Sequence, residues 1–118
     1  MRTAVCDCVV EFSQKSLAVE DDLGIEYIEP ETFADELGRD LYMAFCREMA
    51  TWKALPDYGQ SSATCYLGDI EEVGDDMDFF HKEYRAVFTI KIVYPDGVDI
   101  ESTVLSILDD FGMKPADQ

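Results

Sequence analysis

Two segments alternate between apolar and polar residues with the period of two that is typical of a half-buried β-strand. They run from Thr3 to Phe12 and from Tyr84 to Tyr94. A third strand is expected from Ala63 to Val73, and short strands near residues 17–19 and 25–28. In the segment 84–94 one whole face is apolar, comprising Tyr84, Ala86, Phe88, Ile90, Ile92 and Tyr94. The pattern predicts an antiparallel sheet with one core face and one wetter face.

A first helix is predicted over residues 32–54, where apolar residues recur at intervals of three and four. Thr32 is the expected N-cap, with Asp35 three residues later as in a capping box, and Pro56 ends the helix. The residues expected to face the core are Phe33, Leu37, Leu41, Phe45, Met49 and Trp52.

A second helix is predicted over residues 99–111, with Asp99 as its N-cap. Gly112 suits the left-handed position that follows a helix, and Met113 would then pack back on Leu108 as in a Schellman motif. Residues 114–118 look like a loose tail.

These elements predict a small single α+β domain over residues 1–118. We expect an antiparallel sheet of 3–5 strands packed against two α-helices. A chain of 118 residues with 47% apolar residues has enough material for a core of its own.

The register of the last two long strands is constrained by their apolar faces. We expect the cross-strand pairs Glu71 with Arg85, Asp69 with Val87, and Cys65 with Lys91. This register would place Tyr66 and Ile70 on the core face and would set two carboxylates beside a basic side chain.

The net charge separates this chain from most small domains. It has 26 acidic and 9 basic residues, for a net charge of -17, where a magnitude of about 2–8 is ample for solubility. Such a field repels DNA, RNA and anionic membranes. We therefore expect a basic protein partner, with no direct binding to nucleic acid or membrane.

The carboxylates form two clusters in the sequence. One lies in "GDIEEVGDDMDFF", from Gly68 to Phe80, and the other lies between Glu20 and Asp40, where Arg39 is the one basic residue. The predicted partner-binding residues are Glu20, Asp21, Asp22, Glu26, Glu29, Glu31, Asp35, Glu36, Asp40, Asp69, Glu71, Glu72, Asp75, Asp76, Asp78, Phe79 and Phe80. Of these, Glu72, Asp75, Asp76 and Asp78 are expected to form a turn without counter-charge. Residues two apart on a strand, or four apart on a helix, lie about 6–7 Å apart, which approximates the spacing of successive phosphates.

Metal binding is a second interpretation of the carboxylates. A calcium-binding EF-hand loop starting at Asp69 would have Val73 at the fifth position and Phe80 at the twelfth, where oxygen ligands are required. A zinc site would need the scattered thiols Cys6, Cys8, Cys46 and Cys65 with His81. We expect no metal and no cofactor.

An enzyme with Cys46 or Cys65 as nucleophile and His81 as base remains an alternative, although any chain with these residue types offers such a pair. The four cysteines are expected to be free thiols in a reducing, cytoplasmic compartment. The N-terminal stretch lacks the apolar core of a signal peptide.

In charge, size and compactness the chain resembles small acidic α+β proteins that mimic nucleic acids, such as phage anti-restriction and anti-CRISPR inhibitors. No family motif carries this resemblance. It implies a non-enzymatic inhibitor or interaction protein. An immunity or antitoxin protein that neutralises a basic nuclease is the alternative, and a cysteine-dependent enzyme or an accessory subunit are further ones. The oligomeric state stays open.

Overall fold

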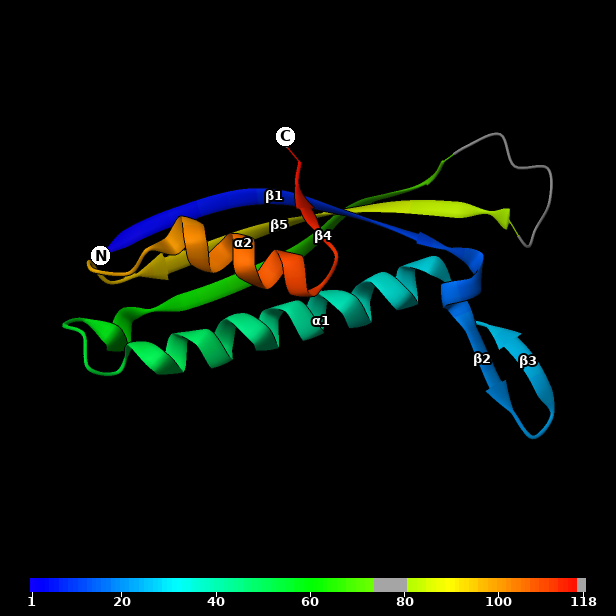
Figure 1. The fold of residues 1–118 in the computed structure, drawn as a ribbon, viewed down its shortest axis with the longest axis horizontal. Coiled ribbons are helices and arrows are strands. Elements are labelled where there is room, and N and C mark those ends of the chain that lie inside the picture. The colour runs from blue at the N-terminus through cyan, green and yellow to red at the C-terminus, as the bar shows by residue number, and fades with distance from the viewer. Residues whose placement is uncertain (74–80, 117–118) are drawn as a thin grey trace.

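The long strands form one antiparallel sheet in the computed structural model, which describes residues 1–73 and 81–116. Its strands are β1 (Arg2–Ser13), β4 (Ser62–Val73), β5 (Glu83–Tyr94) and the short β6 (Lys114–Pro115). They are arranged in the order β4-β5-β1-β6 (Figure 1). The chain is therefore an α+β domain whose sheet is antiparallel, as the alternating pattern predicts.

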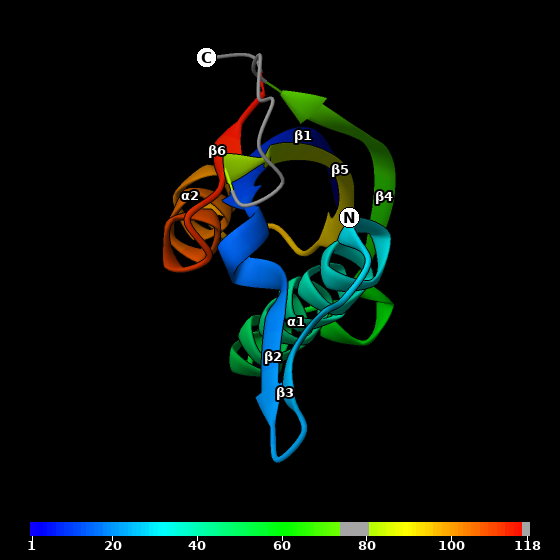
Figure 2. The ribbon, with the colours of Figure 1, turned by 90° about the vertical axis from the view of Figure 1, so that its right-hand side faces the viewer.

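Two helices, α1 (Pro30–Met49) and α2 (Ile100–Asp110), lie on the same face of this sheet. The sheet curves around them, so that the helices occupy its concave side (Figure 2). A separate two-stranded hairpin, β2 (Ala18–Asp21) and β3 (Gly24–Tyr27), projects beyond α1. Short 3-10 turns span Gln14–Leu17, Ala50–Trp52 and Tyr58–Gln60. Within the described residues, no helix has the length and apolar content needed to cross a bilayer.

The core fills the space between the concave face and the helices. Phe88, Ile90 and Ile92 of β5 are each 1% exposed, and they meet Leu41 and Phe45 of α1 in one apolar cluster. The strand alternation and the helical spacing thus identify the right core faces. Burying side chains of this size stabilises the fold by about 1.5–3 kcal/mol each.

The start of α1 differs from the prediction. The helix begins at Pro30, its N-cap is Glu29, and no side chain caps it. Proline lacks the N–H that would be unsatisfied in the first turn, and its fixed φ already suits a helix. The expected cap, Thr32, therefore lies inside the helix. The α-helix ends at Met49 and continues as a 3-10 turn to Trp52.

The ends of α2 confirm the prediction. Asp99 Oδ1 accepts a hydrogen bond from the Ser102 N–H over 3.2 Å. At the other end Gly112 has φ 66°, and the Met113 N–H donates to the Leu108 carbonyl over 2.9 Å. With the bond from Gly112 to the Asp109 carbonyl at 3.0 Å, this is a Schellman motif.

The predicted register of β4 is wrong for the first half of the strand, because a β-bulge shifts the pairing. Glu71 pairs with Arg85 as predicted, but Cys65 pairs with Ile90 and not with Lys91. The bulge between Leu67 and Ile70 inserts one extra residue in β4, and one extra residue moves every earlier side chain to the other face.

Two consequences follow from this bulge. Tyr66, which was expected in the core, lies on the outer face of the sheet and is 60% exposed, whereas Ile70 faces the core. At the bulge a Cβ atom on residue 68 would lie 3.2 Å from the Val87 carbonyl oxygen. A glycine at this position therefore suits the close approach of β5.

The expected loose tail is partly ordered. Lys114 and Pro115 form β6 beside Val9 and Cys8, and the Ala116 N–H donates to the Asp7 carbonyl over 2.8 Å. The Schellman motif turns the chain back from α2 toward the edge of β1, where Met113 is 4% exposed. Residues 117–118 lie outside the described part of the chain.

Candidate functional site

The predicted acidic residues that the structure describes come from three elements. They lie on the β2–β3 hairpin, on the first half of α1, and on the second half of β4, and all of them are exposed. These elements share one half of the molecule, which is 53 Å long (Figure 1). We call this set the acidic end; its members are Glu20, Asp21, Asp22, Glu26, Glu29, Glu31, Asp35, Glu36, Asp40, Asp69, Glu71 and Glu72. The fold therefore brings together two clusters that are far apart in the sequence.

The β2–β3 hairpin is the most exposed part of the acidic end. Every residue of its two strands is exposed, and it projects away from the sheet in both views (Figures 1 and 2). Its turn is held by the Asp21 carboxylate, which accepts from the Leu23 N–H over 2.8 Å, and by Gly24 with φ 122°. Its base is fixed by a hydrogen bond of 2.9 Å from the Ile28 N–H to the carbonyl of the buried Leu17.

Apolar side chains stand among the carboxylates of this hairpin. Leu23 at the tip is 92% exposed, Ile25 is 60% exposed, and Val19 is 47% exposed. A two-stranded hairpin is by itself marginally stable in water, and these exposed side chains add little to folding. A short strand was expected at residues 25–28, but the exposure of these side chains was not predicted, although carboxylates and apolar residues alternate in "DLGIEYI".

On α1 the carboxylates follow the helical repeat. Glu31 and Asp35 are four residues apart, as are Glu36 and Asp40, so each pair lies on one side of the helix. Like charges at this spacing repel each other by about 0.2–0.5 kcal/mol. The two carboxylate pairs therefore make the helix less stable than neutral residues at the same positions would.

Two carboxylates of β4 have cationic neighbours on β5 and beside it. Glu71 Oε1 lies 3.6 Å from Arg85 Nη1, and Glu72 Oε1 lies 3.7 Å from Lys82 Nζ. Glu72 was expected in a turn without counter-charge, so this prediction is wrong: the residue belongs to β4, where the ladder brings it near Lys82. Both carboxylates remain exposed, and such pairs contribute about 0–1 kcal/mol.

Asp75, Asp76, Asp78, Phe79 and Phe80 lie outside the described residues. Their proposed role therefore stays a prediction from the sequence.

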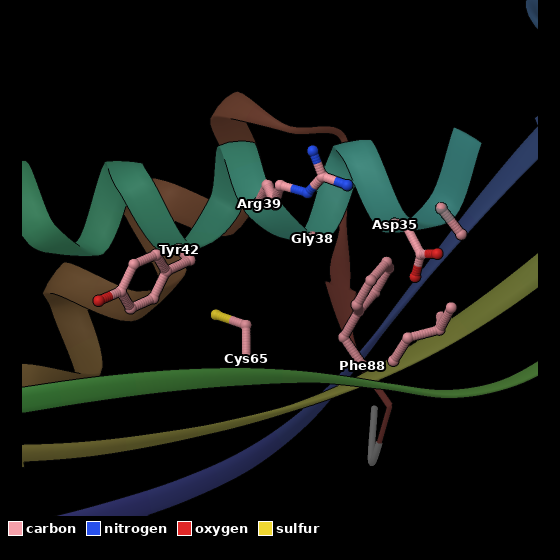
Figure 3. Close-up of a pocket in the computed structure, with 8 residues that line it drawn as sticks. Asp35, Gly38, Arg39, Tyr42, Cys65 and Phe88 are labelled. Carbon is pink, nitrogen blue, oxygen red and sulfur yellow. The ribbon is translucent and has the colours of Figure 1, made fainter. Parts of the chain in front are cut away.

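A groove lies between α1 and β4, beside the acidic end, and we call it the α1–β4 groove. It encloses about 390 Å³ and is lined by Ala34, Asp35, Gly38, Arg39, Tyr42, Cys65, Leu67 and Phe88. Figure 3 shows the Phe88 ring and the Cys65 thiol between helix and strand, with Asp35, Arg39 and Tyr42 along the helix. The base of the groove is apolar and its rim is polar.

Gly38 brings α1 close to the sheet at this groove. A Cβ atom on residue 38 would lie 3.0 Å from Cε1 of Phe88. None of the ion pairs between described residues includes Arg39. The sequence shows Arg39 as an isolated cation but gives no sign of a groove, because a groove depends on how the helix lies on the sheet.

Two of the thiols, Cys8 and Cys65, do not have the pKa of an activated nucleophile. Burial raises the pKa of Cys8 to about 12 and that of Cys65 to about 11, whereas reactive cysteines have lowered pKa values. Cys8 donates to Met113 Sδ over 3.9 Å. In the described part of the chain no three His, Cys, Asp or Glu side chains are grouped so as to hold a metal ion.

Comparison with known proteins gives no relative. No protein-family model, no curated protein sequence and no solved structure matches this chain at a significant level.

Proposed function

We propose that this protein is a non-enzymatic inhibitor or interaction protein whose acidic end binds a basic, nucleic-acid-binding protein in place of nucleic acid. The observation that carries the proposal is the meeting of hairpin, α1 and β4 carboxylates in one half of the molecule (Figure 1). A net charge of -17 disfavours the compact state. A binding role accounts for that cost.

The spacing of the carboxylates supports mimicry of a phosphate backbone. The pair Glu31 and Asp35 and the pair Glu36 and Asp40 are each separated by one helical turn, about 6 Å along the axis. Proteins grip nucleic acids largely through Lys and Arg contacts to successive phosphates. The same cationic side chains would pair with these carboxylates.

The hairpin tip supports a protein partner. A leucine that is 92% exposed does not contribute to solubility, whereas protein interfaces combine apolar anchors with a charged rim. We therefore place Leu23 and Ile25 at the centre of the contact, with Glu20, Asp22 and Glu26 around them.

The proposal is tested with two variants of equal charge. One carries Glu20→Gln, Asp22→Asn and Glu26→Gln in the hairpin, and leaves Asp21 to hold the turn. The matched control carries Glu101→Gln, Asp109→Asn and Asp110→Asn, which are exposed residues of α2 outside the acidic end. Tagged proteins are used to capture partners from a nuclease-treated lysate of the producing cells, and the recovered partner is purified.

The measurement is the partner's affinity for nucleic acid with and without this protein. We expect the wild-type chain and the α2 variant to compete with nucleic acid, and the hairpin variant to compete at least about tenfold less well. Competition should weaken as salt rises, because screening shortens the reach of the charges. A partner that binds tightly yet keeps its full affinity for nucleic acid would contradict the proposal.

A further inference from the structure

Strand β4, 12 residues long, is an edge strand of the sheet. One side of β4 pairs with β5, and no described strand pairs with the other side. Figure 2 shows β4 at the outside of the curved sheet, with α1 below it. An exposed edge of this kind presents a row of unpaired backbone N–H and C=O groups.

Part of this edge lacks the usual protection against pairing. Natural edge strands are often blocked by lysine or proline, and neither residue occurs in β4. The bulge between Leu67 and Ile70 interrupts the second half of the strand. The first half, from Ser62 to Leu67, remains a regular edge.

The α1–β4 groove opens beside this edge. In a strand laid against β4, every second side chain would point to the face that carries Cys65 and Leu67. That face leads to the groove, whose base is formed by Leu67 and Phe88 and whose volume is about 390 Å³. This is enough space for one apolar side chain of the added strand, with its neighbours at the rim.

The charge around the groove determines which kind of added strand would be attracted to it. Asp35 lines it, Glu31 precedes Asp35 by one turn of α1, and Asp69 lies further along β4. Arg39 is the single cation among the lining residues. A second copy of this chain would bring the same surplus of carboxylates, whereas a basic segment would be attracted.

We propose that an extended, basic segment of the partner adds to β4 as a further strand and places one apolar side chain in the α1–β4 groove. This inference rests on the proposed function, because it takes the partner to be a basic protein. It adds the mode of recognition: main-chain hydrogen bonds to the edge, with charge and one apolar anchor for selectivity.

The probe is a fluorescein-labelled peptide of alternating lysine and valine, KVKVKVK, whose binding is followed by fluorescence polarisation. Two further peptides carry N-methyl groups on alternate backbone nitrogens, one on the lysines and one on the valines. In an added strand one of these sets faces β4 and the other faces solvent. We expect one methylated peptide to bind at least about tenfold more weakly than KVKVKVK, because its backbone donors are lost. The other should bind like the unmodified peptide.

Two protein variants locate the binding site. Asp35→Lys changes an exposed residue that lines the groove. Asp110→Lys makes the same charge change on α2, which lies near the other edge of the sheet, away from β4 (Figure 2). Asp35→Lys should weaken binding of KVKVKVK several-fold more than Asp110→Lys does.

Three results would overturn the inference: no binding of KVKVKVK at about millimolar concentration, equal binding of the two methylated peptides, or equal effects of the two protein variants. A stable dimer that excludes the peptide would also overturn it, since a second copy would then occupy the edge. If this protein still competes with nucleic acid for the natural partner and Asp35→Lys does not weaken that competition, the proposed function stands and the strand addition fails.

Discussion

Tyr84 on β5 donates its hydroxyl hydrogen to Gln14 Oε1 over 2.9 Å. Gln14 is 3% exposed and is the buried polar residue of the described chain. Its backbone N–H donates to the Lys82 carbonyl over 2.8 Å. The turn that follows β1 is thus joined to the start of β5 by two hydrogen bonds, and the buried amide has the partner that it requires.

Tyr84→Phe should lower the free energy of unfolding by about 1–2 kcal/mol, because it leaves Gln14 Oε1 buried without a donor. Urea denaturation measures the change. Tyr66→Phe is the matched control: its ring is 60% exposed, so its effect should stay within about 0.5 kcal/mol. Equal effects of the two substitutions would show that the buried hydrogen bond does not matter.

Gly38→Ala should destabilise the fold in spite of alanine's better helix propensity. The new methyl group would lie 3.0 Å from Cε1 of Phe88, whose ring is 1% exposed. Overpacking of a core costs about 1–3 kcal/mol, against a gain of about 1 kcal/mol in the helix. Thermal unfolding should therefore show a lower midpoint. Gly59→Ala has no atom within 4 Å of its new Cβ and should be nearly neutral; a stabilised Gly38→Ala would contradict the expected crowding.

Arg2→Ala should raise the pKa of Asp96. Arg2 Nε lies 2.7 Å from Asp96 Oδ1, and this hydrogen bond and the charge of Arg2 lower the pKa of the carboxyl. A lowered pKa stabilises the fold above the unfolded value, and that stabilisation is lost as pH falls through the folded pKa. Both side chains are exposed, so the effect on stability is small. NMR titration of the Asp96 carboxyl measures the shift directly, and Arg47→Ala should leave it unchanged.

Alkaline pH should destabilise the protein through its buried thiols. Burial raises the pKa of Cys8 to about 12 and of Cys65 to about 11, while thiols of the unfolded chain titrate near pH 8.5. The two thiols therefore keep their protons up to a higher pH in the folded state than in the unfolded state. The free energy of unfolding falls as pH rises above the unfolded pKa toward the folded values. Urea unfolding at neutral pH and near pH 10 should show a smaller difference for the double variant Cys8→Ala, Cys65→Ala than for the wild type. An unchanged difference would exclude the thiols as the cause.

Salt should stabilise the isolated protein. Glu36 and Asp40 are one turn apart on α1, and Glu36→Gln should raise the free energy of unfolding at low ionic strength by about 0.2–0.5 kcal/mol. At about 1 M salt the Debye length is about 3 Å, so the benefit of the substitution should disappear. A benefit that persists at high salt would indicate a cause other than repulsion.

The fold was predictable wherever one signal dominates. Alternation located the long strands, and the side chain of Asp99 with the glycine at position 112 fixed both ends of α2. The start of α1 was misplaced because Thr32 gives a capping signal, while Pro30 gives a stronger one for the first helical position. The exposed position of Tyr66 depends on the bulge between Leu67 and Ile70, and the sequence shows there no more than a glycine, which fits several geometries.

The candidate site was predictable in its charge but not in its shape. Counting carboxylates identified both clusters. Their meeting in one half of the molecule depends on the order β4-β5-β1-β6 and on the direction in which α1 crosses the sheet. Glu72 lies near Lys82 because it belongs to β4, whose ladder with β5 brings the two side chains together, and not to the turn that follows.

The position of β1 in the sheet has a consequence during synthesis. β1 ends at Ser13, but the central strand that it pairs with begins at Glu83, and Arg2 is opposite Tyr94. A ribosome adds about 5–20 residues per second, so several seconds pass between the synthesis of β1 and that of β5. During this time the apolar face of β1 stays uncovered. The β4–β5 ladder links segments that lie closer in the chain, and contacts of that kind form sooner. We expect β1 to join after the β4–β5 ladder has formed, and the abundant negative charge to keep nascent chains apart until it does.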